Sequence, residues 1–339
     1  SRIPLKRTDT LRQVEYTFEA KDSVIISASD KYKKYSGLKR VVLGDNYRKE
    51  WSTPVTLKVF NISKEKGGLQ IVSLGGGKQT KSLKLKDKNG NEWVLRSVDK
   101  DPEKAMPPNL RGTFAQNIVE DMISASHPYA PLVVPGLSVA VDVPTPQPQF
   151  FFVPDDPAFG YYRPLFANTV CLFESRNPDI DKNTKSTDKV LNKMYEDNDN
   201  HVDQEKVLNA RLLDMLIADF DRHADQWKWG TADTGKGKLY YPIPKDRDQA
   251  FFNSNGLALT LLSRKLMPFL QGYKRSVRDI NGANFVARDF DRLFMNNLDK
   301  ATWQSITARF QSNLTDSVII AAAAKFPEAI ASQDSKIIA

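Results

Sequence analysis

The sequence predicts an α+β protein in which a β-rich N-terminal part precedes a mostly helical C-terminal part. Between residues 55 and 174, short alternating apolar and polar runs are separated by glycine, proline and Asn-Gly turns, which is typical of strands. From residue 189 onward, apolar residues recur at helical spacing instead. We therefore expect a linker-like segment with strands over 1–54, a β-rich lobe over 55–174 and a helical lobe over 175–339.

The composition is that of a soluble globular protein, with 40% hydrophobic and 27% charged residues. The longest wholly aliphatic run, 318–324, is too short to cross a bilayer, so we expect no transmembrane segment within this chain. The net charge of +8 fits a phosphorylated ligand, an anionic surface or a solvated basic face, but no motif indicates nucleic acid. The single cysteine, Cys171, excludes an internal disulfide and is expected to be a small core residue.

Turn residues separate the predicted strands of the N-terminal part. Residues 69–85 predict a strand, a glycine turn and a second strand, and residues 87–91 place Asn-Gly at the tip of a hairpin. Together with 55–62 and 93–98, these runs predict one antiparallel sheet over 55–98. Further elements are expected as strands over parts of 16–29 and over 131–141, 149–153 and 169–174, and as a helix over 113–126.

Helices around one strand are predicted for the C-terminal part. Asp188 and Asp203 stand at N-cap positions of helices expected over 189–196 and 203–218. The side chains expected to face the core in the second of these are Val207, Leu208, Leu212, Met215 and Leu216. A strand is expected over 240–243, followed by helices over 257–270, 290–297, 302–313 and 317–331.

Five carboxylates gather in two short segments, and converging carboxylates repel one another unless a cation lies among them. They are Asp219, Asp221, Asp225, Asp246 and Asp248. The first segment follows the C-terminal end of a helix, where the macrodipole disfavours carboxylates, so Arg222, His223 or a metal is expected to compensate. Arg222 could neutralise either a buried acid or a phosphate. No second His or Cys stands at ligand spacing from His223, which argues against zinc and leaves a structural role open for it.

The second acidic segment follows the predicted strand 240–243. Asp246 and Asp248 would share a side of an extended chain, and a pair of carboxylate oxygens there suits Mg²⁺ or Mn²⁺ that carries nucleotide phosphates. The alternative is a charged turn that closes on Phe251 and Phe252.

Two features of the β-rich part are candidates for phosphate contacts. The turn Gly75-Gly76-Gly77 exposes backbone N–H groups, and Lys78 adds a positive charge, although such a turn is also an ordinary hairpin loop. Arg96 lies on the same side of its strand as Val94 and Val98 and therefore needs a partner, for which Glu120 in the following helix is a candidate. The alternative is that Arg96 is a rim residue.

The order of these parts resembles that of a protein-kinase-like fold. The motif 218–226, ADFDRHADQ, is similar to the catalytic loops of the atypical branches: the spore-coat CotH kinases, the secretory-pathway casein kinases, the HipA toxin kinases and the type II phosphatidylinositol kinases. The resemblance implies a two-lobed fold that uses ATP with Mg²⁺ or Mn²⁺. It assigns catalysis to Asp221, Arg222 and His223, nucleotide binding to Gly75, Gly76, Gly77, Lys78, Arg96, Glu120 and the hinge residue Glu174, and metal binding to Asp246, Asp248 and Gln226.

Three positions depart from the pattern of those families. Arg96 stands where they usually have lysine, and Asp219 and Gln226 stand where they have asparagine. A nucleotide-binding pseudokinase that acts as a non-catalytic interaction module is therefore an alternative, and a metal-dependent phosphoesterase that uses the same acids is another. The acceptor of the phosphoryl group is left open.

The chain also resembles a group of uncharacterised Bacteroidetes proteins over residues 40–330. Stretches such as NYRKEW, LRSVDKDPEKA and PIPKDRDQAFF carry this resemblance. In some of those proteins a calcineurin-like metallophosphatase domain precedes and an outer-membrane β-barrel follows, which implies a periplasmic or outer-membrane-associated location. Phosphatase activity is not implied, because the His-rich ligand set of that domain has no counterpart among His127, His201 and His223.

Overall fold

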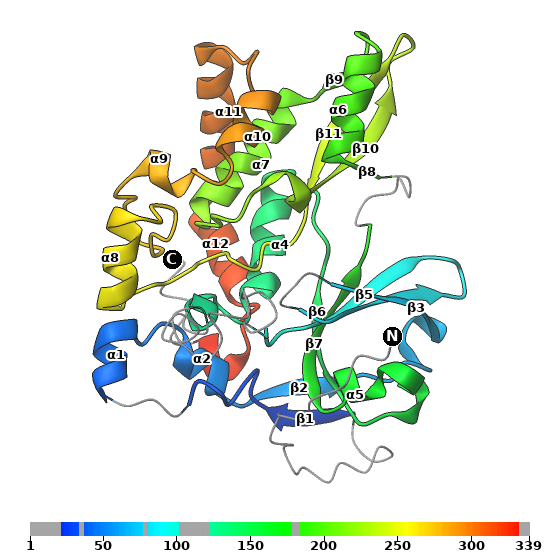
Figure 1. The fold of residues 1–339 in the computed structure, drawn as a ribbon. Coiled ribbons are helices and arrows are strands. Elements are labelled where there is room, and N and C mark those ends of the chain that lie inside the picture. Colours follow the sequence, from blue (N-terminus) through cyan, green and yellow to red (C-terminus); the bar gives the residue numbers. More distant parts are fainter. Residues whose placement is uncertain are drawn as a thin grey trace.

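The computed structural model describes residues 22–33, 37–76, 80–101, 119, 122–177 and 184–331. Within this part of the chain, a seven-stranded sheet is built from the N-terminal half and helices dominate after residue 184. Figure 1 shows the sheet on one side of the molecule and most of the later helices on the other. The predicted α+β class, with a β-rich lobe and a helical lobe, is confirmed. None of the helices described is long and apolar enough to cross a membrane.

The seven strands lie in the order β1-β2-β6-β7-β5-β4-β3, and only β2 and β6 are parallel neighbours. The predicted consecutive hairpins are confirmed as β3-β4-β5. The prediction that 55–62 belongs to the same antiparallel unit is wrong, because β6 and β7 separate β2 from β5. The bounds are β1 (Ser23–Ile26), β2 (Val55–Val59), β3 (Leu69–Gly75), β4 (Ser82–Asp87), β5 (Glu92–Ser97), β6 (Gln149–Val153) and β7 (Thr169–Ser175).

A side chain fixes the turn between β4 and β5. Asp87 Oδ1 accepts hydrogen bonds from the backbone N–H groups of Asn89 and Asn91, both at 2.9 Å. Its Oδ2 accepts from Asn91 Nδ2 and from Trp93 Nε1. Gly90 has a φ of +80°, which glycine adopts without strain. The Asn-Gly turn therefore sets the register in which β5 pairs with β4.

The two faces of this sheet have opposite character. Leu83, Leu85 and Leu95 are fully buried on one face, where they join a phenylalanine-rich core. Cys171 is buried in that core, as predicted, and burial raises the pKa of its thiol to about 12. The opposite face carries Arg96 in register with Leu172 of β7. Because side chains alternate along a strand, the buried leucines orient Arg96 toward the helical part of the molecule.

Helix α4 (Ala130–Ala140) corrects the prediction of a strand over 131–141. The valines of this run favoured a strand and its prolines favoured turns, but its buried positions recur at helical spacing, as at Val133, Val134 and Leu137. Pro131 lies in the first turn, where its missing N–H costs nothing. Gly136 allows close packing on α12, since a Cβ there would lie 3.1 Å from the Cβ of Ala322.

The C-terminal helices follow the predicted order with shifted ends. Asp203 caps α7 as predicted, accepting a hydrogen bond of 3.0 Å from the N–H of Lys206, whereas α6 starts after Ser186 rather than after Asp188. Leu216 is exposed, and Leu213 takes the core position instead. The bounds are α6 (Thr187–Glu196), α7 (Gln204–Leu216), α8 (Leu257–Lys265), α9 (Ile280–Ala283), α10 (Arg288–Phe294), α11 (Lys300–Asn313) and α12 (Asp316–Ala323).

Short elements complete the part near the sheet. Within the predicted helix 113–126, residues 119 and 122–125 are helical, and 113–118 and 120–121 lie outside the described residues. Residues 16–21 of the first predicted strand region also lie outside them. The remaining elements are α1 (Gly37–Leu43), α2 (Arg48–Ser52), η1 (Glu65–Gly67), η4 (Pro157–Tyr162), α5 (Arg163–Phe166) and η5 (Ala224–Gln226).

A hairpin in the helical part brings the two acidic segments together. Its strands are β10 (Trp227–Asp233) and β11 (Lys238–Pro244), and they pair from Trp227 opposite Pro244. The short strands β8 (Lys185–Ser186) and β9 (His201–Val202) flank them. The loop before β10 and the segment after β11 therefore emerge side by side at the same end of the hairpin, which places both acidic segments opposite the charged face of the sheet.

Candidate functional site

A pocket lies between the charged face of the sheet and the end of the β10-β11 hairpin. It encloses about 810 Å³ of space without atoms, its open mouth included. Its apolar wall includes Val98, Val134, Phe150, Leu172 and several prolines. Its charged lining consists of Arg96, Lys100, Glu174, Lys245, Asp246, Arg247 and Asp248.

Arg96 and Asp246, predicted from distant parts of the sequence, meet in this pocket. Arg96 Nη1 forms an ion pair with Asp246 Oδ1, and its Nη2 lies 3.6 Å from Glu174 Oε1. Asp246 has a φ of +54°, in the left-handed region, which turns the chain away from the strand direction of β11. Burial raises the pKa of Asp246, but the charges of Arg96 and Lys100 outweigh burial and hold it below its usual range. The carboxylate is therefore ionised at neutral pH.

A second ion pair lies beside the first. Lys100 Nζ is 2.6 Å from Asp248 Oδ2, and Asp248 Oδ1 accepts a hydrogen bond of 3.0 Å from Gln249 Nε2. Sequence reasoning missed Lys100. A signal was present, because Arg96, Val98 and Lys100 alternate and so fall on one side of an extended chain.

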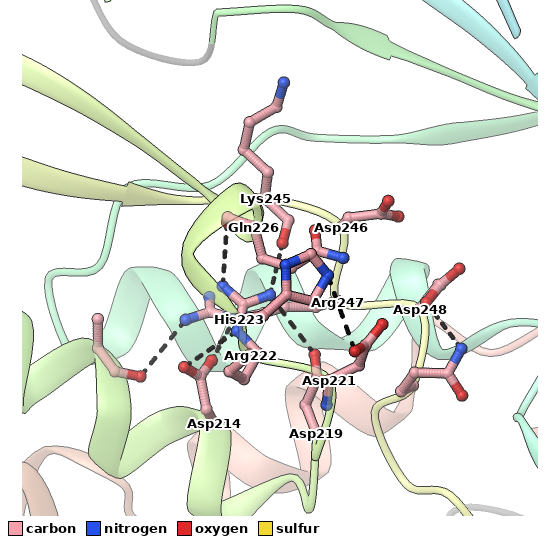
Figure 2. Close-up of polar contacts among 12 residues, drawn as sticks. Asp214, Asp219, Asp221, Arg222, His223, Gln226, Lys245, Asp246, Arg247 and Asp248 are labelled. Atoms are coloured by element: carbon pink, nitrogen blue, oxygen red, sulfur yellow. Dashed lines mark hydrogen bonds and ion pairs between the residues drawn. The ribbon is translucent and has the colours of Figure 1, made fainter. Parts of the chain in front are cut away.

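The segment 218–226, which follows α7, presents Asp221 at its surface. The Asp221 carboxylate is half-buried, and its Oδ1 lies 3.8 Å from His223 Nε2. Figure 2 shows the two side chains pointing toward one another. Burial raises the pKa of Asp221 and the nearby charge of Asp248 adds to the rise, whereas His223 and Lys100 lower it. Asp221 itself does not line the pocket, whereas Asp248 and Lys100, whose charges act on it, do.

Arg222 is fully buried beneath this loop. Its Nε lies 3.2 Å from Asp214 Oδ2, and its Nη1 donates a hydrogen bond of 2.6 Å to the carbonyl oxygen of Lys245. Its Nη2 donates to the carbonyl oxygen of Gln226 at 3.3 Å (Figure 2). Of the two roles that the sequence left open for Arg222, the structure shows it neutralising a buried acid. The same side chain ties both acidic segments to α7.

Asp214 is the centre of a buried ion-pair network that sequence reasoning missed. Its Oδ2 also lies 3.1 Å from Arg211 Nη1, and its Oδ1 lies 2.9 Å from Arg247 Nε. Burial raises the pKa of Asp214, but the three guanidinium groups outweigh it and lower the pKa. The available signal was a single acid inside the apolar run 212–217, LLDMLI, of a predicted helix.

Asp219 lies next to this network without a hydrogen bond to its Oδ2, which is 3.8 Å from Arg222 Nη1. Its Oδ1 accepts a hydrogen bond of 3.2 Å from the N–H of Asp221. Burial raises the pKa of Asp219 to about 7, although Arg222 acts in the opposite direction. Asp219 is therefore the one departure from the kinase-like pattern whose charge changes near neutral pH.

We expect Asp219 to make stability depend on pH. Its pKa is raised in the fold, so the folded state holds a proton that the unfolded state loses between about pH 4 and pH 7. The group therefore stabilises the fold below its unfolded pKa, and stability falls by up to about 1.4 kcal/mol per pH unit across that window. Asp219→Asn should flatten this decline in urea unfolding curves recorded at several pH values. An unchanged slope would contradict the assignment.

The other predicted residues lie as follows. Gly75 ends β3, and Gly76 has a φ of +110° in the turn that follows. Glu174 directs its side chain at Arg96, and burial raises its pKa although Arg96 acts against it. The carbonyl oxygen of Gln226 accepts a hydrogen bond of 2.9 Å from the N–H of Lys245, which keeps Gln226 beside the second acidic segment. Gly77, Lys78 and Glu120 lie outside the described residues.

Two carboxylates that line this pocket, Asp246 and Asp248, are the candidates for metal binding. Among the described residues, no group of three or more His, Cys, Asp or Glu side chains converges as a metal site. Mg²⁺ commonly takes one or two protein carboxylates together with substrate phosphates and water. The ionised Asp246, with Asp248 two residues away, fits that kind of site.

Comparisons with known proteins give one structural similarity to report. No family model matches the sequence, and no curated protein matches it at a significant level. The structure is similar to the crystal structure of a Helicobacter pylori proinflammatory kinase, CtkA, with a TM-score of 0.43 and 11% sequence identity, over 76% of this chain and 88% of that one. A similarity at this level carries no information about activity, and the resemblance to the Bacteroidetes group stays a prediction.

Proposed function

We propose that this chain is a kinase-like protein that binds a nucleotide with a divalent cation and transfers a phosphoryl group to an acceptor hydroxyl. The contact between Arg96 and Asp246 carries this proposal. The two residues are 150 positions apart in the sequence and come from the sheet and from the end of the hairpin. Phosphoryl-transfer sites of the kinase-like kind need a strand cation for the phosphates and a carboxylate for the metal in one cleft.

The pocket offers groups for each part of such a complex. Arg96 and Lys100 are cations that phosphate oxygens would engage, and Asp246 and Asp248 are the carboxylates that would hold the divalent cation. When bound, the divalent cation would neutralise charge on the phosphate oxygens. The apolar wall, including Val98 and Leu172, excludes water from one side of the site, which strengthens these charge interactions.

Asp221 would act on the acceptor. Its carboxylate accepts the hydroxyl proton while the acceptor oxygen forms a bond to the terminal phosphorus. The bond from that phosphorus to the bridging oxygen breaks, and its electron pair stays on the leaving nucleoside diphosphate, whose charge Arg96 stabilises. The raised pKa of Asp221 makes it a better proton acceptor than an exposed aspartate.

Non-catalytic nucleotide binding is a second candidate, and one observation favours it. The residues at the two asparagine positions of the kinase-like pattern are Asp219 and Gln226. A protein that binds the nucleotide and performs no transfer is compatible with this arrangement. Measurement of transfer separates the two candidates.

We expect ATP with Mn²⁺ to raise the melting temperature of the protein and Asp246→Ala to abolish that rise. A ligand present at about 100 times its Kd stabilises a fold by about 2.7 kcal/mol, which thermal-shift assays resolve. The ligand-dependent shift is the quantity to compare, because Asp246→Ala also leaves Arg96 without its nearest partner.

Asp225→Ala is the matched control, because Asp225 belongs to the neighbouring acidic segment before β10, its side chain is 91% exposed and it lines no part of the pocket. The control should keep the full shift. Absence of a shift in the parent protein, or an equal shift in Asp246→Ala, would contradict nucleotide binding at this site.

A further inference from the structure

Exposed apolar and cationic side chains lie together on α8, on α9 and on the chain between them, which we call the α8–α9 surface. Figure 1 shows both helices along one edge of the molecule, on the side away from β3. The exposed large apolar side chains are Leu257, Leu261, Leu266, Met267, Val277 and Ile280. The cations are exposed as well, and they are Arg264, Lys265, Lys274, Arg275 and Arg278. Large apolar side chains that share one exposed surface are typical of a contact site, whereas singly scattered ones are not.

The outer face of α8 combines leucines with cations. Leu257, Leu261 and Lys265 stand four residues apart, the spacing that brings side chains onto one face of a helix. Arg264 comes three residues after Leu261 and joins the same face. The buried residues of the helix lie on the opposite face, and they are Leu259 and Ser263. A helix whose outer side only meets water carries polar residues there, so the exposed leucines of α8 indicate a partner that is partly apolar.

Hydrogen bonds hold the parts of this surface next to one another. Arg278 Nη2 donates a hydrogen bond of 3.0 Å to the carbonyl oxygen of Ser263 in α8. Gln271 Nε2 donates to the carbonyl oxygen of Asp279 at 2.7 Å, and Gln271 Oε1 accepts from the N–H of Asp279 at 3.0 Å. The end of α8, the loop after Leu266 and the start of α9 are therefore neighbours in space.

Aromatic rings support the α8–α9 surface from beneath. The ring of Phe269 stacks on that of Phe285 with a centroid distance of 6.5 Å, and it also packs on Phe220 at 5.5 Å. Phe220 precedes Asp221 in the chain, so these rings join the surface to the segment that carries Asp221. No member of the surface lines the pocket itself.

Carboxylates do little to compensate the cations of this surface. Between Leu257 and Ala283 the sequence has five lysines and arginines and one acid, Asp279. Asp279 caps α9, where its Oδ1 accepts a hydrogen bond of 3.0 Å from the N–H of Gly282. Within the part of the chain that the structure describes, none of the five cations has a carboxylate at ion-pair distance. The surface is therefore complementary to a partner with a high density of negative charge.

The interface of an anionic bilayer meets both requirements of the α8–α9 surface. Its headgroups attract lysine and arginine, and the acyl chains just below them accept leucine, valine and isoleucine side chains. A nucleic acid would bind the cations and leave the apolar side chains in water. An acidic protein would need carboxylates and an apolar patch placed to match this surface, whereas lipid headgroups rearrange around it.

We propose that the α8–α9 surface docks the protein on a lipid bilayer that contains anionic phospholipids. The apolar side chains enter the boundary between headgroups and acyl chains, and the cations bind the headgroup anions around them. The protein lies on the bilayer and does not span it. Docking does not depend on the proposed function, because its residues lie outside the pocket.

Vesicles of phosphatidylcholine, with and without phosphatidylserine, are the probe, and co-sedimentation measures the bound protein. We expect binding to the vesicles with phosphatidylserine and none to the others. The double substitution Arg264→Gln with Lys265→Gln should weaken binding roughly 25-fold, about fivefold for each cation near an anionic surface. Lys236→Gln with Lys238→Gln is the control, because it removes the same charge from exposed positions around the turn of the β10-β11 hairpin and should leave binding unchanged.

A second pair of variants tests the apolar contribution. Leu261→Ser should weaken binding to the same vesicles roughly tenfold, because an inserted leucine side chain returns to water. Ile320→Ser is the control, since Ile320 is 60% exposed on α12 and Leu261 is 62% exposed on α8. Both substitutions are at exposed helical positions, so equal melting temperatures should show that the fold is retained.

No binding of the parent protein to vesicles with phosphatidylserine would overturn the proposal, as would equal losses in the test variants and their controls. Loss of binding in the Arg264/Lys265 variant with full binding by Leu261→Ser would indicate charge attraction alone. That result would favour an acidic macromolecule as the partner and would also overturn docking on a bilayer. The ATP–Mn²⁺ thermal shift should remain in every one of these variants, so nucleotide binding and bilayer docking fail separately.

Discussion

Asp214→Asn is expected to lower the free energy of unfolding by about 3–5 kcal/mol, the cost of removing one partner from a buried ion pair. Asp214 is fully buried and is the shared partner of Arg211, Arg222 and Arg247. Without the charge of Asp214, Arg211 keeps its ion pair with Asp291. Arg222 keeps only Asp219, whose Oδ2 is 3.8 Å away. The buried positive charge then destabilises the fold.

Urea unfolding followed by circular dichroism measures this loss, and Asp289→Asn is the control. Asp289 pairs with Arg288 on the surface, where its side chain is 77% exposed, so its removal should change stability little. If Asp214→Asn unfolds at the same urea concentration as Asp289→Asn, Asp214 does not compensate the three arginines.

Asp221→Asn is expected to reduce phosphoryl transfer roughly 100- to 10,000-fold, the range typical of a lost general base. The substitution keeps the shape of the side chain, and the backbone N–H of Asp221 still donates to Asp219. Asp221 takes no part in the Asp214 network, so the fold and the ATP–Mn²⁺ thermal shift should remain. Transfer from radiolabelled ATP to the protein itself or to a generic acceptor is the measurement.

The matched substitution is Asp225→Asn on the same loop, which should leave transfer unchanged. Transfer that persists in Asp221→Asn would remove Asp221 from the mechanism. Nucleotide binding without any transfer by the parent protein would instead establish the non-catalytic candidate, in agreement with the asparagine positions taken by Asp219 and Gln226.

Local chemistry made much of the fold predictable. The β4-β5 hairpin follows from Asp87 and the Asn-Gly turn, and the start of α7 follows from Asp203 as its cap. Helix α4 was predicted wrongly because valine favours strands and proline disfavours a helix interior, and its burial pattern became decisive only once the chain packed against α12. The position of β2 beside β6 depends on contacts between residues far apart in sequence, which no local pattern encodes.

The site was predictable where charge stood out against an apolar background. Arg96 on a strand and the acids around Asp221 and Asp246 were visible for that reason, and the structure brings Arg96 and Asp246 into contact. The network around Asp214 was not visible, because the partners Arg222 and Arg247 resemble ordinary loop charges until α7 and the hairpin meet. Lys100 escaped notice because it lies beyond the predicted strand 93–98, and its ion pair with Asp248 forms only where the sheet meets the segment after β11.

In the two ion pairs that span the pocket, the protein's own carboxylates compete with any entering phosphate for the two cations. Arg96 and Lys100 are four residues apart, and their partners Asp246 and Asp248 are two apart, so the two ion pairs lie next to each other between the sheet and the segment after β11. A phosphate binds these cations only when the carboxylates release them. A divalent cation can then bind the carboxylate oxygens that have been released. Anion and metal should therefore bind as a matched pair, each raising the affinity for the other.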